Sequence, residues 1–305
     1  MLALEDTYLC GMITPLVTPF RRGAVDYDAY GDLVEFQISN GAHGLLLNGP
    51  MSEASSLTLE ERNRLVEVAI EVANGRTMLV VSTGAASLAE TRELTRFAAA
   101  DSDVDAVLVP VPSSPRPPQR GLLSYFRALN KLHDKPWLIG HAPGAERPDV
   151  TLETAIAIDK MCPSFVGMSH ASLDLGYVSA LLYEISEDLR IFCGLDAMSY
   201  PMMAVGACGT MGGVGNIIPR AVVDMCEAVW DGDLNKARDL NHSLYELNKA
   251  VTFDVNPIPL KYMMKRMGIM PGNDHRLPLT PAQPELEKQL DYVLRRTGMI
   301  RGGHV

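Results

Sequence analysis

The chain has 305 residues, of which 47% are hydrophobic and 21% are charged, a balance typical of a globular protein with a large core. Acidic residues outnumber basic ones by 37 to 27, which gives a net charge of −10. This charge argues against a nucleic-acid partner and against a basic membrane-binding face, because both need clustered Lys and Arg.

Short apolar runs alternate along the chain with longer amphipathic ones. The short runs are rich in Val, Ile and Leu, as expected of parallel strands that are covered on both faces. We predict strands at Met12–Val17, Gly44–Leu47, Met78–Ser82, Ala106–Val109, Trp137–Gly140, Phe165–Ser169, Arg190–Cys193 and Gly209–Gly213.

The amphipathic runs carry helix-capping signals. Thr58 precedes the helical pattern Leu59–Ala73 with Glu61 three residues later, which is the spacing of a capping box. Ser87 precedes Glu90 in the same way, and Thr151 precedes a helix over Glu153–Met161. These signals predict a helix after most of the strands.

Regular alternation of strands and helices favours a closed (β/α)₈ TIM barrel over an open, doubly wound sheet. An open sheet would place a glycine-rich phosphate-binding turn after its first strand, but the segment there is TPLVTPF (residues 14–20). The proline-rich segment Pro110–Pro118 is interpreted as a rigid loop at the barrel mouth.

The last part of the chain is predicted to be helical. We expect residues 1–230 to form the barrel and residues 231–305 to form a C-terminal helical extension packed on it, as one structural domain. The predicted helices are Arg220–Trp230, Asp233–Val251, Pro257–Met267 and Pro284–Arg296.

The cysteines and the N-terminus indicate a cytoplasmic protein. The cysteines are odd in number, widely spaced and mostly in apolar runs, which predicts free buried thiols; none has the C-x-x-C spacing of a zinc site. The N-terminus lacks the basic and apolar regions of a signal peptide, and no apolar run approaches the ~20 residues of a membrane helix. The cysteines are Cys10, Cys162, Cys193, Cys208 and Cys226.

Motifs at the expected strand ends resemble those of the dihydrodipicolinate synthase / N-acetylneuraminate lyase family. They are TPLVTPF, NGPMSEASSLTLEER (48–62), STGA (82–85), GLDAMS (194–199), GNIIPRA (215–221), VNPIPLKY (255–262) and HRLPLTP (275–281). The resemblance extends from about Gly11 to Gly298. It implies a barrel of the class I aldolase type, with no cofactor, that assembles as a homodimer or homotetramer.

The resemblance fails at the residue that carries the chemistry of the family. A lysine on the sixth strand of those enzymes forms a Schiff base with a 2-oxo acid. The corresponding segment here is Gly167-Met168-Ser169-His170, which puts Ser169 in the place of the lysine. A hydroxyl cannot form an imine, so the electron sink of the family is absent.

Other parts of the family site are also replaced. The motif with two hydroxyl residues after the second strand is Gly49-Pro50-Met51 here, and Pro50 lacks even a backbone N–H. Glycine (Gly140) stands at the tyrosine of the fifth strand. Ser113 and Ser114 replace the tyrosines that follow the fourth strand. Ala145 aligns with a family arginine, and Arg147 lies two residues on.

These replacements predict a larger and less polar ligand pocket at the barrel mouth. Gly140 alone should open about the volume of a side chain. The ligand is expected to be a small organic molecule, with carbonyl acids among the candidates. The residues predicted to line the pocket are Pro50, Met51, Ser114, Gly140, Ser169, Gly194 and Met211.

No other lysine is predicted at the C-terminal end of a strand. Lys135 and Lys160 precede strands, which places them at the opposite face of the barrel, and Lys261 matches a lysine often found in the helical extension of the family. The remaining lysines are Lys131, Lys236, Lys249, Lys265 and Lys288.

Two histidines at neighbouring strand ends leave further chemistry open. His141 and His170, with Glu53 and Asp196, could form a metal site or an acid–base pair. Side chains alternate along a strand, so if Gly140 and Ser169 face the interior, both histidines point toward the helices and have a structural role. Glu53 is interpreted as architectural, and no base is evident that could activate Ser169 as a nucleophile.

Three functions stay open from the sequence. The first is a lyase or hydratase that works without a Schiff base. The second is a non-catalytic relative that senses a ligand or supports an active paralogue. The third is a pyruvate-type lyase with a relocated lysine. The catalytic residues are not identified.

Overall fold

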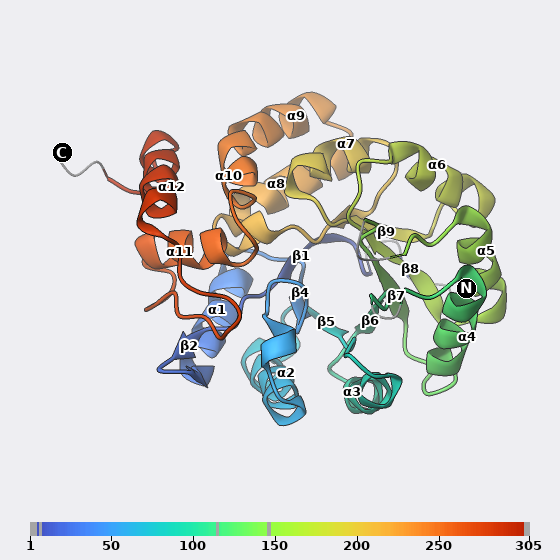
Figure 1. Ribbon diagram of the computed structural model, residues 1–305. Coiled ribbons are helices and arrows are strands. Elements are labelled where there is room, and N and C mark those ends of the chain that lie inside the picture. The colour runs from blue at the N-terminus through green and yellow to red at the C-terminus, as the bar shows by residue number, and fades with distance from the viewer. Residues whose placement is uncertain (1–4, 6–7, 114–115, 145–147, 302–305) are drawn as a thin grey trace.

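The computed structural model describes residues 5, 8–113, 116–144 and 148–301. Eight parallel strands close into a barrel in chain order, and helices surround it (Figure 1). The predicted (β/α)₈ barrel is therefore confirmed. The strands are β1 (Gly11–Pro15), β4 (Gly44–Leu47), β5 (Met78–Ser82), β6 (Ala106–Pro110), β7 (Trp137–His141), β8 (Phe165–His170), β9 (Arg190–Cys193) and β10 (Gly209–Thr210).

Helices connect successive strands, as predicted, and three 3₁₀ turns and a small hairpin lie between them. The hairpin pairs β2 (Phe20–Arg21) with β3 (Ala24–Val25) and was not predicted. The helices are α1 (Tyr27–Ser39), α2 (Leu59–Ala73), α3 (Leu88–Ala100), α4 (Gln119–Asn130), α5 (Leu152–Met161), α6 (Leu175–Glu184), α7 (Ser199–Ala204) and α8 (Pro219–Trp230), and the turns are η1 (Ala54–Ser56), η2 (Asp196–Met198) and η3 (Gly213–Asn216).

The capping signals in the sequence form as predicted. Thr58 and Ser87 each accept a hydrogen bond from a backbone N–H of their helix. The carboxylates of Glu61 and Glu90 accept from the backbone N–H of Thr58 and Ser87, which completes the two capping boxes. Thr151 caps α5 through the backbone N–H of Thr154. Each cap satisfies donors that the helix itself leaves free, which fixes where these helices begin.

The C-terminal extension contains α9 (Leu234–Ser243), α10 (Tyr245–Ala250), α11 (Ile258–Arg266) and α12 (Pro284–Arg296). The prediction of a single helix over Asp233–Val251 is wrong, because the helix is interrupted at Leu244, between α9 and α10. Ser243 donates its hydroxyl to the carbonyl of Leu240 at 2.6 Å, and such back-bonding weakens a helix locally. The division at residue 230 stays a prediction, although α8 ends there.

The apolar core has two layers, one on each side of the barrel wall. Side chains from alternate strand positions fill the interior, and the opposite positions pack against the helices. In the outer layer Trp137 stacks on Phe126 with ring centroids 5.5 Å apart. The interior cluster includes Ile13, Leu46, Val80, Leu108, Leu138, Val166, Phe192 and Met211.

A bulge in β8 decides which of its side chains enter the barrel. Leu138 of β7 pairs with Gly167, and the register shifts between Trp137 and Leu138. Val166 lies in the interior cluster, whereas Met168 lies in the outer layer. Strict alternation from Val166 would turn Ser169 outward, so the bulge is what places Ser169 on the interior side.

Replacing Gly167 by alanine should destabilise the barrel strongly. Its φ is +156°, and a Cβ there would overlap the backbone of Arg190 on β9. We expect a loss of several kcal/mol, roughly 3 or more, in the free energy of unfolding measured by urea denaturation. Gly31→Ala in α1 is the matched control, because its Cβ would meet Val72 at an ordinary 3.4 Å. The control should be neutral or slightly stabilising; equal losses in both variants would contradict this account of the bulge.

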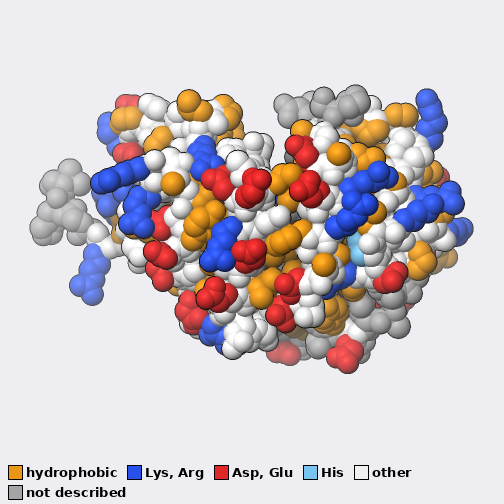
Figure 2. Space-filling model, turned by 90° about the horizontal axis from the view of Figure 1, so that it is seen from below, with side chains coloured by type: hydrophobic (Ala, Val, Ile, Leu, Met, Phe, Trp, Pro, Cys, Tyr) orange, Lys and Arg blue, Asp and Glu red, His pale blue; other side chains and the backbone are white. Residues whose placement is uncertain are grey.

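The surface mixes charges of both signs. On the face seen in Figure 2, acidic and basic side chains are interspersed with apolar ones. Within the described part of the chain, no helix has the length and apolar character needed to cross a bilayer.

Candidate functional site at the barrel mouth

A row of half-buried residues crosses three neighbouring strands at the mouth. Pro110 of β6 pairs with Gly140 of β7, and Gly140 pairs with Ser169 of β8. Each of the three is partly exposed, whereas the residue before each is buried. Gly194, directly after β9, is partly exposed as well. Solvent therefore reaches the C-terminal end of the barrel wall along this row, where barrel enzymes place their sites.

Ser169 supplies the only side-chain heteroatom among Pro110, Gly140, Ser169 and Gly194. It pairs with Phe192 of β9, whose side chain lies in the interior cluster. Among the described residues nothing accepts from or donates to the Ser169 hydroxyl. This hydroxyl is therefore available to a ligand, both as a donor and as an acceptor.

The volume expected at Gly140 is not open beside its Cα. A Cβ there would lie 2.9 Å from Cδ2 of Leu108 and 3.0 Å from Cα of Pro110. Both distances are too short for an ordinary contact, so neighbouring residues already occupy the start of the missing side chain. The expected volume is therefore not found directly beside the Gly140 Cα, and the role of Gly140 in lining a ligand pocket stays a prediction.

The other predicted lining residues differ in their burial. Pro50 is exposed on the turn after β4, whereas Met51 is partly buried and its methyl group lies near Gly213. Met211 is 3% exposed within the interior cluster. Gly194 lies against Ala171, where a Cβ would be 2.8 Å from the Cβ of that residue. Ser114, Ala145 and Arg147 lie outside the described residues.

His141 and His170 point outward, as the alternation predicts. Both are 1% exposed and pack beside the ring of Tyr177 on α6, with centroids 5.6 and 5.2 Å from it. His141 Nε2 lies 2.8 Å from a carboxylate oxygen of Asp149 and accepts from the N–H of Val150 at 3.2 Å, and its Nδ1 lies 3.0 Å from Nδ1 of His170. His170 Nε2 is buried and has no hydrogen-bond partner among the described residues. The pair lies behind the barrel wall and does not face the mouth.

The histidine pair should make stability depend on pH. Burial, followed by the neighbouring His141, lowers the pKa of His170 from 6.5 to about 4. Between these two pH values the unfolded chain binds a proton at His170 that the folded chain does not bind. The contribution of His170 to the free energy of unfolding is therefore complete above pH 6.5 and is lost as the pH falls toward 4. Between about pH 7 and about pH 5, the free energy of unfolding should fall by about 2 kcal/mol less in His170→Phe than in the wild-type chain, as measured by urea denaturation.

An exposed histidine provides the control for this measurement. His242 lies on the exposed side of α9, so His242→Phe should leave the pH dependence of the wild-type chain unchanged. If His170→Phe and the wild-type chain lose stability in parallel, the histidine pair does not titrate as described.

Lys261 of α11 is the most deeply buried lysine. Its ammonium donates to Glu53 Oε1 at 2.8 Å, to the carbonyl of Thr18 at 2.9 Å and to the carbonyl of Asp274. His275 lies 2.9 Å from the same Glu53 oxygen. Burial alone would raise the pKa of Glu53, but His275 and Lys261 outweigh it and lower that pKa. This arrangement gives Glu53 the architectural role predicted for it.

The lysines do not provide an amine at the mouth. All eight lie within the described residues. Lys135 donates to the carbonyls of Asp101 and Val104, before β6, at the opposite face of the barrel as predicted. Lys261 has three acceptors, the full complement of an ammonium group. The others are exposed: Lys131, Lys160, Lys236, Lys249, Lys265 and Lys288.

Removing the Lys261 charge should destabilise the chain strongly. Lys261→Met leaves Glu53 buried with only His275 and the backbone N–H of Arg276 as partners, and breaking a buried ion pair from one side costs roughly 3–5 kcal/mol. The free energy of unfolding in urea measures this loss. Lys265→Met, at an exposed position of the same helix, should cost less than about 1 kcal/mol. A similar small loss at Lys261 would show that its ion pair does not hold α11 in place.

Asp196, the other predicted acid, is engaged by the backbone. Its carboxylate accepts from the N–H of Gly213 at 3.0 Å and of Val214 at 2.9 Å, so it fixes η3 over the end of β10. Among the described residues no group of three or more His, Cys, Asp or Glu could hold a metal ion. None of the five cysteines, all of which lie within the described residues, forms a disulfide, and four of them are buried as predicted, whereas Cys208 is partly exposed.

A cavity of about 420 Å³ lies beside the mouth, between η1, α2 and the segments that follow β5 and β6. Arg62 of α2 lines it, is 3% exposed, and donates to the carbonyls of Ser82 and Gly84 at 2.8 Å each. Burial lowers the pKa of Arg62 to about 10. The sequence did not single out Arg62, because its spacing fits an ordinary helix.

Comparison with known proteins agrees with the strand-end motifs. The family model of the "Dihydrodipicolinate synthetase family" matches residues 8–297. The chain belongs to this family. It is 39% identical over 291 residues to a 4-hydroxy-tetrahydrodipicolinate synthase of Thermus thermophilus, covering 95% of this chain and 97% of the relative. A synthase of Aquifex aeolicus is 33% identical over 286 residues, covering 94% and 97%.

Solved structures of the family share the fold. The crystal structure of dihydrodipicolinate synthase from Aquifex aeolicus superposes with a TM-score of 0.91 at 32% identity, covering 95% of this chain and 98% of that one. The enzyme from Acinetobacter baumannii, solved in complex with pyruvate, gives 0.91 at 31% identity, covering 96% and 100%. The barrel and the extension thus belong to one shared architecture.

Proposed function

We propose that this family member binds a small organic ligand at the barrel mouth without forming an imine. The observation that carries the proposal is the half-buried, unpaired hydroxyl of Ser169 on the interior side of β8. A hydroxyl can hydrogen-bond a carbonyl or a carboxylate, but it cannot condense with a ketone. Carbonyl acids are the first ligands to test, since the Acinetobacter baumannii relative was solved with pyruvate.

The buried lysine does not offer a substitute nucleophile. Lys261 donates to three oxygens and lies beside Phe20, with its Nζ 4.6 Å from the ring centroid. An imine-forming lysine must lose its proton and approach the ligand carbonyl. Lys261 would have to leave the carboxylate of Glu53 to do either. This argues against a pyruvate-type lyase with a relocated lysine.

Two activities are compatible with such a site. A lyase or hydratase would need an acid or base next to the ligand, and the row of Pro110, Gly140, Ser169 and Gly194 contains no such group. That composition favours the second candidate, a non-catalytic ligand sensor or structural partner. We also propose, from the family alone, that the chain forms a homodimer or homotetramer in the cytoplasm.

Borohydride trapping tests the absence of imine chemistry. With pyruvate and sodium borohydride, the wild-type chain should show no covalent adduct by intact-mass spectrometry. Ser169→Lys should acquire the mass of one reduced pyruvyl group, because a lysine there lies on the interior side at a half-buried position. Lys265→Met, which removes an exposed amine, is the control and should behave as the wild-type chain does.

An adduct on the wild-type chain would overturn the proposal, and peptide mapping would locate the amine. Ligand binding itself is tested by thermal shift with 2-oxo acids of increasing side-chain length. Ser169→Ala should reduce the shift for any acid that binds, and ligands that bind should then be incubated with the chain and assayed for turnover. Equal thermal shifts in the wild-type chain and in Ser169→Ala would show that the ligand does not contact Ser169.

A further inference from the structure

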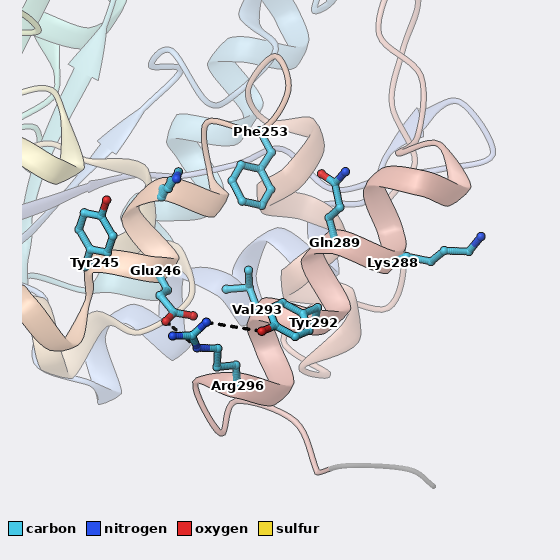
Figure 3. Close-up of a pocket in the computed structure, with 9 residues that line it drawn as sticks. Tyr245, Glu246, Phe253, Lys288, Gln289, Tyr292, Val293 and Arg296 are labelled. Carbon is cyan, nitrogen blue, oxygen red and sulfur yellow. Dashed lines mark hydrogen bonds and ion pairs between the residues drawn. The ribbon is translucent and has the colours of Figure 1, made fainter. Parts of the chain in front are cut away.

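A second cavity lies on the C-terminal extension, away from the barrel mouth. It is a groove of about 580 Å³ between α10 and α12, which Figure 3 shows in close-up. None of its lining residues belongs to the row at the mouth. Its volume lies within the range of small-molecule sites. The residues that matter for its chemistry are Tyr245, Glu246, Lys249, Phe253, Lys288, Tyr292 and Arg296.

Aromatic side chains form the walls of this groove and remain open to solvent. Tyr245 is 61% exposed, Tyr292 is 60% exposed and Phe253 is 37% exposed. Val293, which is 7% exposed, also lines the groove, so the groove is apolar between its walls. Exposed rings that converge on one cavity offer a large contact area to a flat apolar ligand.

The charges around the groove do not balance. Arg296 Nε lies 2.9 Å from Glu246 Oε1, and its NH1 donates to the hydroxyl of Tyr292 at 3.5 Å, so the carboxylate is neutralised (Figure 3). Lys249 and Lys288 have no ion-pair or hydrogen-bond partner among the described residues. Two cations without such a partner therefore lie at the rim of the groove, on a chain whose net charge is −10, although Figure 3 shows the Lys288 side chain directed away from the rings.

We propose that this groove binds a small anion with a flat apolar body. The body lies between the rings of Tyr245, Phe253 and Tyr292. The anionic group is attracted by Lys249, and Lys288 adds positive charge at the rim of the groove. Aromatic contact and unpaired positive charge are the two features that such a molecule requires. The inference does not depend on the function proposed for the mouth.

A fluorescent anion of this class tests the groove directly. The full-length chain is titrated with 8-anilinonaphthalene-1-sulfonate, which should bind with a stoichiometry of one per chain. Tyr292→Ala and the double variant Lys249→Glu/Lys288→Glu should each weaken binding by about tenfold. Circular dichroism and thermal unfolding confirm that each variant is folded, as expected from the exposure of all three side chains.

Matched controls separate the groove from general attraction to the dye. Lys131→Glu/Lys160→Glu changes the net charge equally at two exposed positions, one directly after α4 and one on α5, and should leave the affinity within about twofold of the wild-type value. The neutral analogue N-phenyl-1-naphthylamine should bind less tightly and should not respond to the lysine substitutions. Unchanged dye affinity in Tyr292→Ala, or equal losses in both double variants, would overturn the proposal. So would a change in sedimentation of Tyr292→Ala, because the occupant would then be a second copy of the chain.

Discussion

The ammonium group of Lys261 is buried where α11 meets the segments that follow β1 and β4, and the geometry around the mouth depends on how its charge is satisfied. It contacts Thr18 after β1, Glu53 after β4 and Asp274 between α11 and α12. Glu53 adopts a left-handed backbone conformation, with φ of 55°, which directs its carboxylate to this point. A single buried pair thus ties the C-terminal extension to two loops of the barrel. Such pairs fix geometry more than they add stability, because desolvation offsets most of the attraction.

The bulge at Gly167 has a different effect, since it determines what the interior of the barrel presents to a ligand. With the bulge, Ser169 faces the mouth and His170 joins His141 against α6. Without it, the imidazole would face the mouth and the hydroxyl would face the helices. His170 is therefore kept out of the site by one inserted residue, and ordinary alternation along β7 keeps His141 out. The lowered pKa values of both histidines follow from their burial.

Much of the fold was predictable because parallel strands and capped helices have strong local signals. β4, β5 and β9 begin and end where the apolar runs predicted, and the caps at Thr58 and Ser87 form as expected. The break between α9 and α10 was missed because the helical pattern continues through it. The site was less predictable. Alternation gave the outward direction of His141, but the filling of the space beside Gly140 by Leu108 depends on packing between strands, which no local pattern encodes.

In the site proposed at the mouth, which forms no imine, the binding energy must come from other contacts. A Schiff base holds a 2-oxo acid covalently and supplies the electron sink, whereas the net contribution of one hydroxyl hydrogen bond is about 0.5–1.5 kcal/mol. The rest of the binding energy must come from the residues that line the proposed site. The neighbours of Ser169 are apolar, because Phe192 pairs with it and Met211 lies in the same interior cluster as Phe192. Burial of apolar surface then selects the ligand, at about 25 cal/mol per Å². Under the proposed function we therefore expect a longer, more apolar carbonyl compound to bind better than pyruvate, because pyruvate has only one methyl group to bury.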